Sequence, residues 1–129
     1  MKKRKTIKFI IKERTFKTRT LFVLNCGFKE FAKIVKSYGI EVENLGKFIN
    51  GMVLSSNDNK YFFRTIWYED AKDFGGLIHE VFHLVVRICD DKGVPIKAHI
   101  ETGQCGDETA AYLLEFYTNE VFKKLKINN

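Results

Sequence analysis

The stretch GGLIHEVFHLVVRICD, residues 75–90, decides how the rest of the chain is interpreted. Apolar residues fill most of it, and the polar positions before Arg87 are His79, Glu80 and His83. The run is too long for a typical strand and contains no proline, so the pattern predicts one helix. Because apolar residues occupy nearly every side of that helix, we expect it to be buried.

The three polar residues spell H-E-x-x-H. At about 100° per helical residue, His79 and His83 lie about 40° apart and one turn along, so both imidazoles can bind one cation. Glu80 points about 100° away from His79 around the helix, but its carboxylate can reach a water molecule on that metal. Zinc acidifies its water and polarises a carbonyl, while a carboxylate base moves the proton to the leaving group. The spacing therefore predicts metal-assisted hydrolysis, and the alternative is a pair of core histidines bonded to the backbone.

A zinc site needs a third protein ligand, and four residues are candidates. His99 and Cys105 lie in a segment predicted to be a loop, residues 94–106. Cys89 follows His83 by six residues, which turns it about 240° away on a continuing helix, so it is expected in the core. Glu108 opens the last predicted helix, and two alanines that follow it leave room for close packing. We choose Glu108, with Cys105 and His99 as the alternatives.

The rest of the chain alternates strand and helix patterns. Two strands that turn near residues 12–15, or one long strand, are expected within residues 6–24, and a hairpin from residues 47–55 and 60–69 with its turn at 56–59. Helices are expected over 27–39, along the apolar run to Cys89 with an end at Gly93 and Pro95, and from residue 107 onward. Asn25 is a possible cap of the first helix and Gly39 its stop, while Asp70 or Asp73 caps the second.

These elements follow the order β-β-α-β-β-α-α, which predicts an α+β fold. The chain has 129 residues, 45% hydrophobic residues and only one proline, which suits one packed domain over residues 1–129. We expect a mixed sheet packed against the H-E-x-x-H helix and the C-terminal helix.

The net charge of +6 is unevenly distributed. Residues 1–20 hold nine Lys or Arg and one acid, whereas the remainder holds thirteen against fifteen. The basic N-terminal segment is predicted to be a solvated strand face, and the alternative is a patch that binds nucleic acid or an acidic partner.

Three cysteines, Cys26, Cys89 and Cys105, form no C-x-x-C pair. No stretch resembles a signal peptide, and no apolar run approaches the roughly 18 residues of a membrane span. We therefore expect free thiols in a soluble, cytoplasmic protein with no membrane partner.

With its H-E-x-x-H helix followed by a helix that opens on a glutamate, the chain resembles the zincin metallopeptidases of the gluzincin type. It is similar to small phage and bacterial zincin-like proteins in which a hairpin precedes the motif helix, over residues 47–125. The resemblance implies zinc held by His79, His83 and Glu108, with Glu80 as general base. It also implies bacterial or phage-infected host cytosol.

Tyr112 stands where some gluzincins carry an aspartate that orients a ligand histidine. It is expected to pack, to stabilise a developing oxyanion, or to serve as a hydrogen-bond partner of a ligand. The resemblance further implies that the strand at residues 61–69 pairs through an open edge with a peptide, so that Arg64 and Trp67 touch substrate or lie on an exposed sheet face.

The predicted function is a zinc metallopeptidase that cleaves a peptide bond in a specific protein partner through a water activated by Glu80. The alternative is a non-catalytic, zinc-stabilised binding module whose basic N-terminal segment contacts nucleic acid or an acidic partner. A structural site would be closed by four protein ligands, whereas a hydrolase keeps one position open.

Overall fold

The computed structural model describes residues 5–42, 49–55, 64–94, 96, 98–99, 104–105 and 108–128. The chain divides into two compact units, Met1–Glu80 and Val81–Asn129, whose boundary falls inside the helix that carries H-E-x-x-H. The prediction of a single domain stays a prediction.

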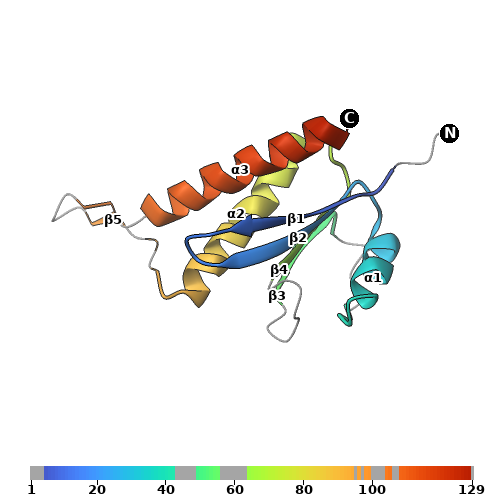
Figure 1. Ribbon diagram of the computed structural model, residues 1–129, viewed down its shortest axis with the longest axis horizontal. Helices are drawn as coiled ribbons and strands as arrows, with labels where there is room; N and C mark the ends of the chain where they lie inside the picture. The colour runs from blue at the N-terminus through green and yellow to red at the C-terminus, as the bar shows by residue number, and fades with distance from the viewer. Residues whose placement is uncertain are drawn as a thin grey trace. The chain divides into compact units, whose positions relative to one another are not determined.

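The first unit contains a four-stranded mixed sheet (Figure 1). Its strands are β1 (Ile7–Glu13), β2 (Thr18–Leu24), β3 (Gly51–Ser55) and β4 (Arg64–Tyr68). The strand order is β1-β2-β4-β3, with β2 parallel to β4 and the other two pairs antiparallel.

Within the described ranges, three helices complete the main elements: α1 (Phe28–Lys36), α2 (Phe74–Asp91) and α3 (Glu108–Asn128). The α+β class, the mixed sheet and the order β-β-α-β-β-α-α are thereby confirmed. The predicted hairpin is present as the antiparallel pair β3–β4, whereas its expected turn at residues 56–59 lies outside the described residues.

The turn between β1 and β2 is closed by a buried carboxylate. Glu13 is 1% exposed, and its carboxylate accepts backbone hydrogen bonds from Thr15 at 2.8 Å and Phe16 at 2.7 Å. Lys17 completes the turn in the left-handed region with φ 53°. The local hydrogen bonds of one side chain thus set where this basic hairpin reverses direction.

Helix α1 packs its apolar stripe on one face of the sheet. Phe31 and Val35 are fully buried in a cluster with Val23 and Trp67, and the Phe31 ring stacks on the Trp67 ring at 5.4 Å. The predicted stripe is confirmed, because residues four apart lie on one helical face. These contacts anchor α1 to the two central strands, β2 and β4.

The two predicted boundary residues of α1 differ in outcome. The N-cap is Gly27 rather than Asn25. Asn25 instead has φ 67°, and its side-chain amide donates to the Lys5 carbonyl at 2.9 Å. Asparagine tolerates this left-handed backbone better than most residues, so it serves the turn instead of the helix. Gly39, with φ 83°, follows the helix as predicted.

The second unit contains the later part of α2, a short strand pair and α3. The pair is β5 (Ala98–His99) with β6 (Gln104–Cys105), antiparallel, within a segment predicted to be a loop. Helix α3 buries Leu113, Tyr117 and Val121 completely, and their spacing of four residues defines its apolar side. None of the helices in the described part of the chain is long and apolar enough to cross a membrane.

Candidate metal centre

Helix α2 starts from a side-chain cap that is itself held by the sheet. Asp73 precedes the helix, and its Oδ1 accepts a hydrogen bond from the Gly76 backbone at 3.1 Å. Its Oδ2 accepts a hydrogen bond from the Tyr68 hydroxyl at 2.5 Å. The capping prediction is confirmed for Asp73, and β4 thereby fixes the first turn of α2.

The Tyr68–Asp73 hydrogen bond couples two titrations. It is the main reason that the pKa of Tyr68 rises to about 12, with burial as the second cause. The same bond, followed by the one from the Gly76 backbone, lowers the pKa of Asp73. Ionising Tyr68 or protonating Asp73 would remove the charge-assisted bond that positions the helix.

Two glycines allow close approach around Tyr68. A Cβ on Gly76 would lie 1.8 Å from the Tyr68 hydroxyl oxygen. A Cβ on Gly51, the first residue of β3, would lie 2.7 Å from Tyr68 Cδ1 and 3.0 Å from Glu80 Cδ. Real Cβ atoms do not approach other heavy atoms this closely, so both positions require glycine for steric reasons.

Glu80 therefore lies against the sheet rather than in solvent. It is 9% exposed, and its Cγ and Cδ would each lie 3.0 Å from a Cβ on Gly51, so both atoms pack beside the backbone at that position. A buried carboxylate costs free energy unless its environment compensates it, and such positions are common for catalytic acids and bases. The H-E-x-x-H carboxylate thus occupies a sterically defined place between α2 and β3.

The two motif histidines face outward. His79 and His83 are both exposed on α2, and Phe82 between them is 49% exposed. The expectation that the motif helix is buried on nearly every side is therefore wrong. The buried side of the helix holds Leu77, Glu80, Val81 and Leu84. Because water solvates the exposed imidazoles, no metal is needed to offset a free-energy cost of burying them. Their helical spacing still suits two ligands of one cation.

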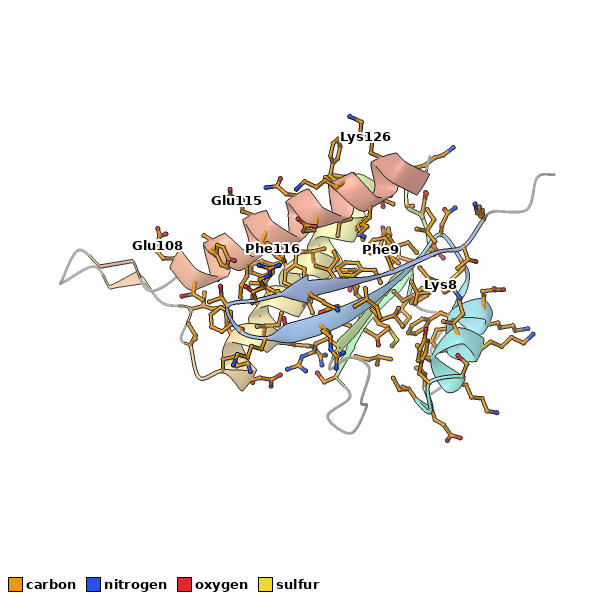
Figure 2. The ribbon with its side chains drawn as sticks, in the orientation of Figure 1. Lys8, Phe9, Glu108, Glu115, Phe116 and Lys126 are labelled. Atoms are coloured by element: carbon orange, nitrogen blue, oxygen red, sulfur yellow. The ribbon has the colours of Figure 1, made fainter. Side chains whose placement is uncertain are left out.

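The predicted third ligand lies at the start of the last helix. Glu108 is the first residue of α3 and is exposed (Figure 2). Within the described part of the chain, no group of three or more His, Cys, Asp or Glu side chains is arranged to hold a metal ion. The structure thus brings His79 and His83 together on one helix, and the assignment of Glu108 stays a prediction.

The remaining candidates for that ligand divide into two kinds. Cys89 is 1% exposed, and burial raises the pKa of its thiol, which confirms its placement in the core. It is a free cysteine, as is Cys26, whose pKa burial and the nearby Glu30 raise to about 11. His99 and Cys105 lie on β5 and β6, and their side chains are outside the described part.

Tyr112 lies on the surface of α3. Its side chain is 45% exposed, and its ring stacks on Phe116 at 6.2 Å. A hollow of about 220 Å³ on this helix is lined by Tyr112, Phe116 and four polar neighbours. This stacking contact agrees with the packing role. The oxyanion role and the hydrogen-bond role stay predictions.

The strand expected to capture a peptide is not at the sheet edge. β4 lies between β2 and β3, so both of its sides are paired and the prediction of an open edge there is wrong. Arg64 is 5% exposed and Trp67 is 1% exposed, which excludes both the substrate-contact and the exposed-face interpretations. The Trp67 indole N–H donates to the Cys26 carbonyl at 2.9 Å. Among the strands that the structure describes, β3 is the terminal one on that side of the sheet.

Sequence reasoning missed Gly51, which lies against Glu80, and Gly76, which leaves room for the Tyr68 hydroxyl. A signal was present, because a glycine inside a strand or a helix often marks close approach of a neighbouring group. The identity of that neighbour depends on the register of β3 against β4, which pairs Gly51 with Tyr68 and which the sequence pattern does not specify.

No family model, curated protein or solved structure matches this chain. The geometry of α2 and its neighbours therefore carries the functional argument.

Proposed function

We propose that the protein is a zinc-dependent hydrolase that cleaves a peptide bond in a protein partner. The observation that carries the proposal is the different placement of the imidazoles and the carboxylate on α2. Two imidazoles one turn apart face outward, and the carboxylate next to the first imidazole packs beside the edge strand β3. Two nitrogen donors and a separately positioned carboxylate are the parts that metal-assisted hydrolysis needs.

His79 and His83 would hold the metal, with Glu108 as the third ligand. Imidazole nitrogen and carboxylate oxygen are ordinary zinc donors, and three protein ligands would leave one position for water. A zinc ion bound there would supply a Lewis acid for the substrate carbonyl and would lower the pKa of a water molecule.

Glu80 would act as the general base. Its carboxylate would accept a proton from the attacking water and return it to the nitrogen of the leaving amine. The close approach of its side chain to Gly51 limits the positions that the carboxylate can take, and this would reduce the reorganisation needed when the proton moves. The hydrogen bond from Tyr68 to Asp73 fixes the helix turn that precedes the base.

Substrate would bind along β3 instead of β4. Among the described strands, β3 pairs only with β4, so its other edge can accept an extended peptide by strand addition. Gly51, at the start of β3, lies beside Glu80. A peptide bound to this edge would therefore pass near the proposed base.

The first experiment is elemental analysis of the purified protein and of three variants. We expect about one zinc per wild-type chain, loss of zinc in His79→Ala and His83→Ala, and retention in Glu80→Gln. Asp90→Asn, an exposed carboxylate change further along α2, serves as the control. Absence of zinc from the wild type after reconstitution, or its retention in both histidine variants, would overturn the ligand assignment.

The second experiment is cleavage of a peptide library by the zinc-loaded protein. Loss of a general base typically lowers the rate about 10²- to 10⁴-fold, so Glu80→Gln should lose activity while keeping zinc. Equal cleavage by wild type and Glu80→Gln would contradict the role of the base. Glu108→Gln should instead lose zinc and activity together.

A further inference from the structure

The positive charge of the chain is concentrated in the part that forms β1, β2 and α1. Residues 5–42 hold nine Lys or Arg and three acids, and one of those acids, Glu13, is 1% exposed. The described residues of 64–94 and 108–128 hold seven Lys or Arg against nine acids. A charge difference of this size between regions creates a local field that attracts anions.

The fold places much of this charge on one side of the sheet. Lys8 pairs with Val23 and Lys12 with Arg19 across the β1–β2 ladder, and directly opposite residues share a face. Val23 packs in the cluster with Phe31 of α1. Lys8 and Lys12 are exposed and project from the face that α1 covers, and Figure 2 shows Lys8 beside that helix.

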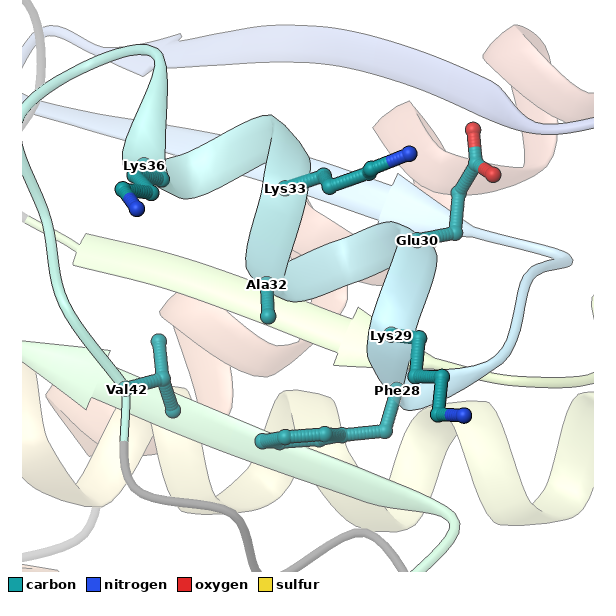
Figure 3. Close-up of a pocket in the computed structure, with 7 residues that line it drawn as sticks. All are labelled: Phe28, Lys29, Glu30, Ala32, Lys33, Lys36 and Val42. Atoms are coloured by element: carbon teal, nitrogen blue, oxygen red, sulfur yellow. The ribbon is translucent and has the colours of Figure 1, made fainter.

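Helix α1 adds a pocket to this surface. The pocket has a volume of about 490 Å³, within the usual range for small-ligand sites. Its apolar lining is Phe28, Ala32 and Val42, and its charged lining is Lys29, Glu30, Lys33 and Lys36 (Figure 3). Three cations against one anion make the rim positive.

An aromatic ring at the pocket is held in a fixed orientation. The Phe28 ring packs edge-on to Trp67 at 5.6 Å and to Phe31 at 6.1 Å. Phe28 is only partly buried, so part of its ring faces the pocket. A rigid, partly exposed aromatic ring can support a planar ligand group by stacking.

We propose that this surface binds single-stranded nucleic acid, with the phosphates on the lysines of α1 and β1 and a base in the Phe28 pocket. Lysines on two elements, α1 and β1, suit an elongated polyanion better than a compact one. Duplex bases are stacked and paired, whereas a single strand can place a base on an aromatic ring. This inference goes beyond the proposed hydrolase and does not depend on zinc.

The first test measures fluorescence anisotropy of a labelled single-stranded oligonucleotide with the full chain. The variant Lys33→Gln/Lys36→Gln is compared with Lys92→Gln/Lys126→Gln, which removes equal charge from exposed positions outside this surface. Loss of two phosphate contacts should reduce the salt slope of log K by about 1.4 and raise Kd by about tenfold. The control pair should bind as the wild type does.

Two results of this test would overturn the proposal. One is no binding at low ionic strength with the protein at about 100 µM, the weak limit of non-specific association. The other is an equal loss of binding in the two double variants, because binding would then depend on the net charge of the protein and not on this surface.

The second test examines the pocket by itself. Ala32→Leu fills part of the pocket with a residue that suits a helix almost as well as alanine. We expect it to weaken binding of the normal oligonucleotide by about fivefold, a value within the stacking contribution of one base. Binding of an abasic strand of the same length should not change. Equal effects on both strands would overturn base insertion.

Competitors decide the class of partner. A duplex of the same sequence should bind more weakly than the single strand, and poly-glutamate should compete only weakly. Tighter binding of the duplex would overturn the preference for single strands. Strong binding of poly-glutamate that depends on Lys33 and Lys36 would overturn the proposal in favour of an acidic protein partner. Zinc content should be the same in every variant, which separates this result from the hydrolase.

Discussion

The two sides of α2 differ in what they require from the rest of the protein. One side carries His79, Phe82 and His83 in contact with solvent, and the other carries the buried Leu77, Glu80 and Val81. The buried side near the helix start fits against Tyr68 and Gly51 with almost no spare space. The exposed side is thus accessible to solvent, whereas the buried side determines where the helix and its carboxylate lie.

The adjacent glycines at the start of α2 test this difference most directly. In Gly76→Ala the new Cβ would meet the Tyr68 hydroxyl oxygen at 1.8 Å, whereas the nearest atom to a Cβ on Gly75 is 4.0 Å away. We expect Gly76→Ala to lower the free energy of unfolding by about 3 kcal/mol through overpacking. Gly75→Ala should leave it unchanged or raise it by up to about 1 kcal/mol, because alanine favours helix. Urea denaturation of both variants measures the difference, and equal stabilities would contradict the tight fit.

A smaller effect is expected at the other glycine beside Tyr68. Gly51→Ala would place a Cβ 2.7 Å from Tyr68 Cδ1 and 3.0 Å from Glu80 Cδ. Because Glu80 is a flexible side chain, part of the clash can be relieved, and we expect a loss of about 1–2 kcal/mol. The displaced carboxylate should also reduce hydrolysis in the zinc-loaded protein more than Gly75→Ala does. A stable and fully active Gly51→Ala variant would show that Glu80 does not depend on this contact.

The sequence pattern was sufficient to predict the four strands of the sheet and the three helices that the structure describes. It was insufficient to predict the order of the strands across the sheet. A period of two or of about 3.6 residues shows which side chains share a face, so Phe31, Val35 and the β3–β4 hairpin were predictable. The same periods do not state which strand lies beside β2. The open edge that the resemblance implies for β4 is therefore wrong, because the parallel pairing with β2 puts this strand inside the sheet.

The candidate site shows the same limit at the level of single residues. The motif fixes the helical spacing of His79 and His83, but an apolar run does not show which positions remain exposed. The close packing of Glu80 depends on Gly51, which is far from the motif in sequence. Contacts between such residues follow from strand register, and register is set by pairing partners rather than by one segment.

The hydrogen bond from Tyr68 to Asp73 predicts an alkaline loss of stability. Folding raises the pKa of Tyr68 from 10.0 to about 12. The stabilisation is therefore fully present below pH 10 and is lost as pH rises through about 12. Chemical denaturation of the wild type between these limits should show the decline, and Tyr68→Phe should show less of it. A pH dependence identical in both proteins would contradict this origin.

The smallest effect on stability is expected for the exposed motif histidines. In metal-free protein, His79→Ala and His83→Ala should change the free energy of unfolding by no more than about 0.5 kcal/mol, because both side chains face solvent. Addition of zinc should change the free energy of unfolding of the wild type and of the histidine variants by different amounts. At 100 times its Kd, a ligand that binds only the folded state stabilises it by about 2.7 kcal/mol. We expect that gain in the wild type and in Asp90→Asn, and none in either histidine variant. If removing His79 destabilised the metal-free protein by as much as Gly51→Ala does, the imidazole would have a structural role, and the two sides of α2 would not differ as described.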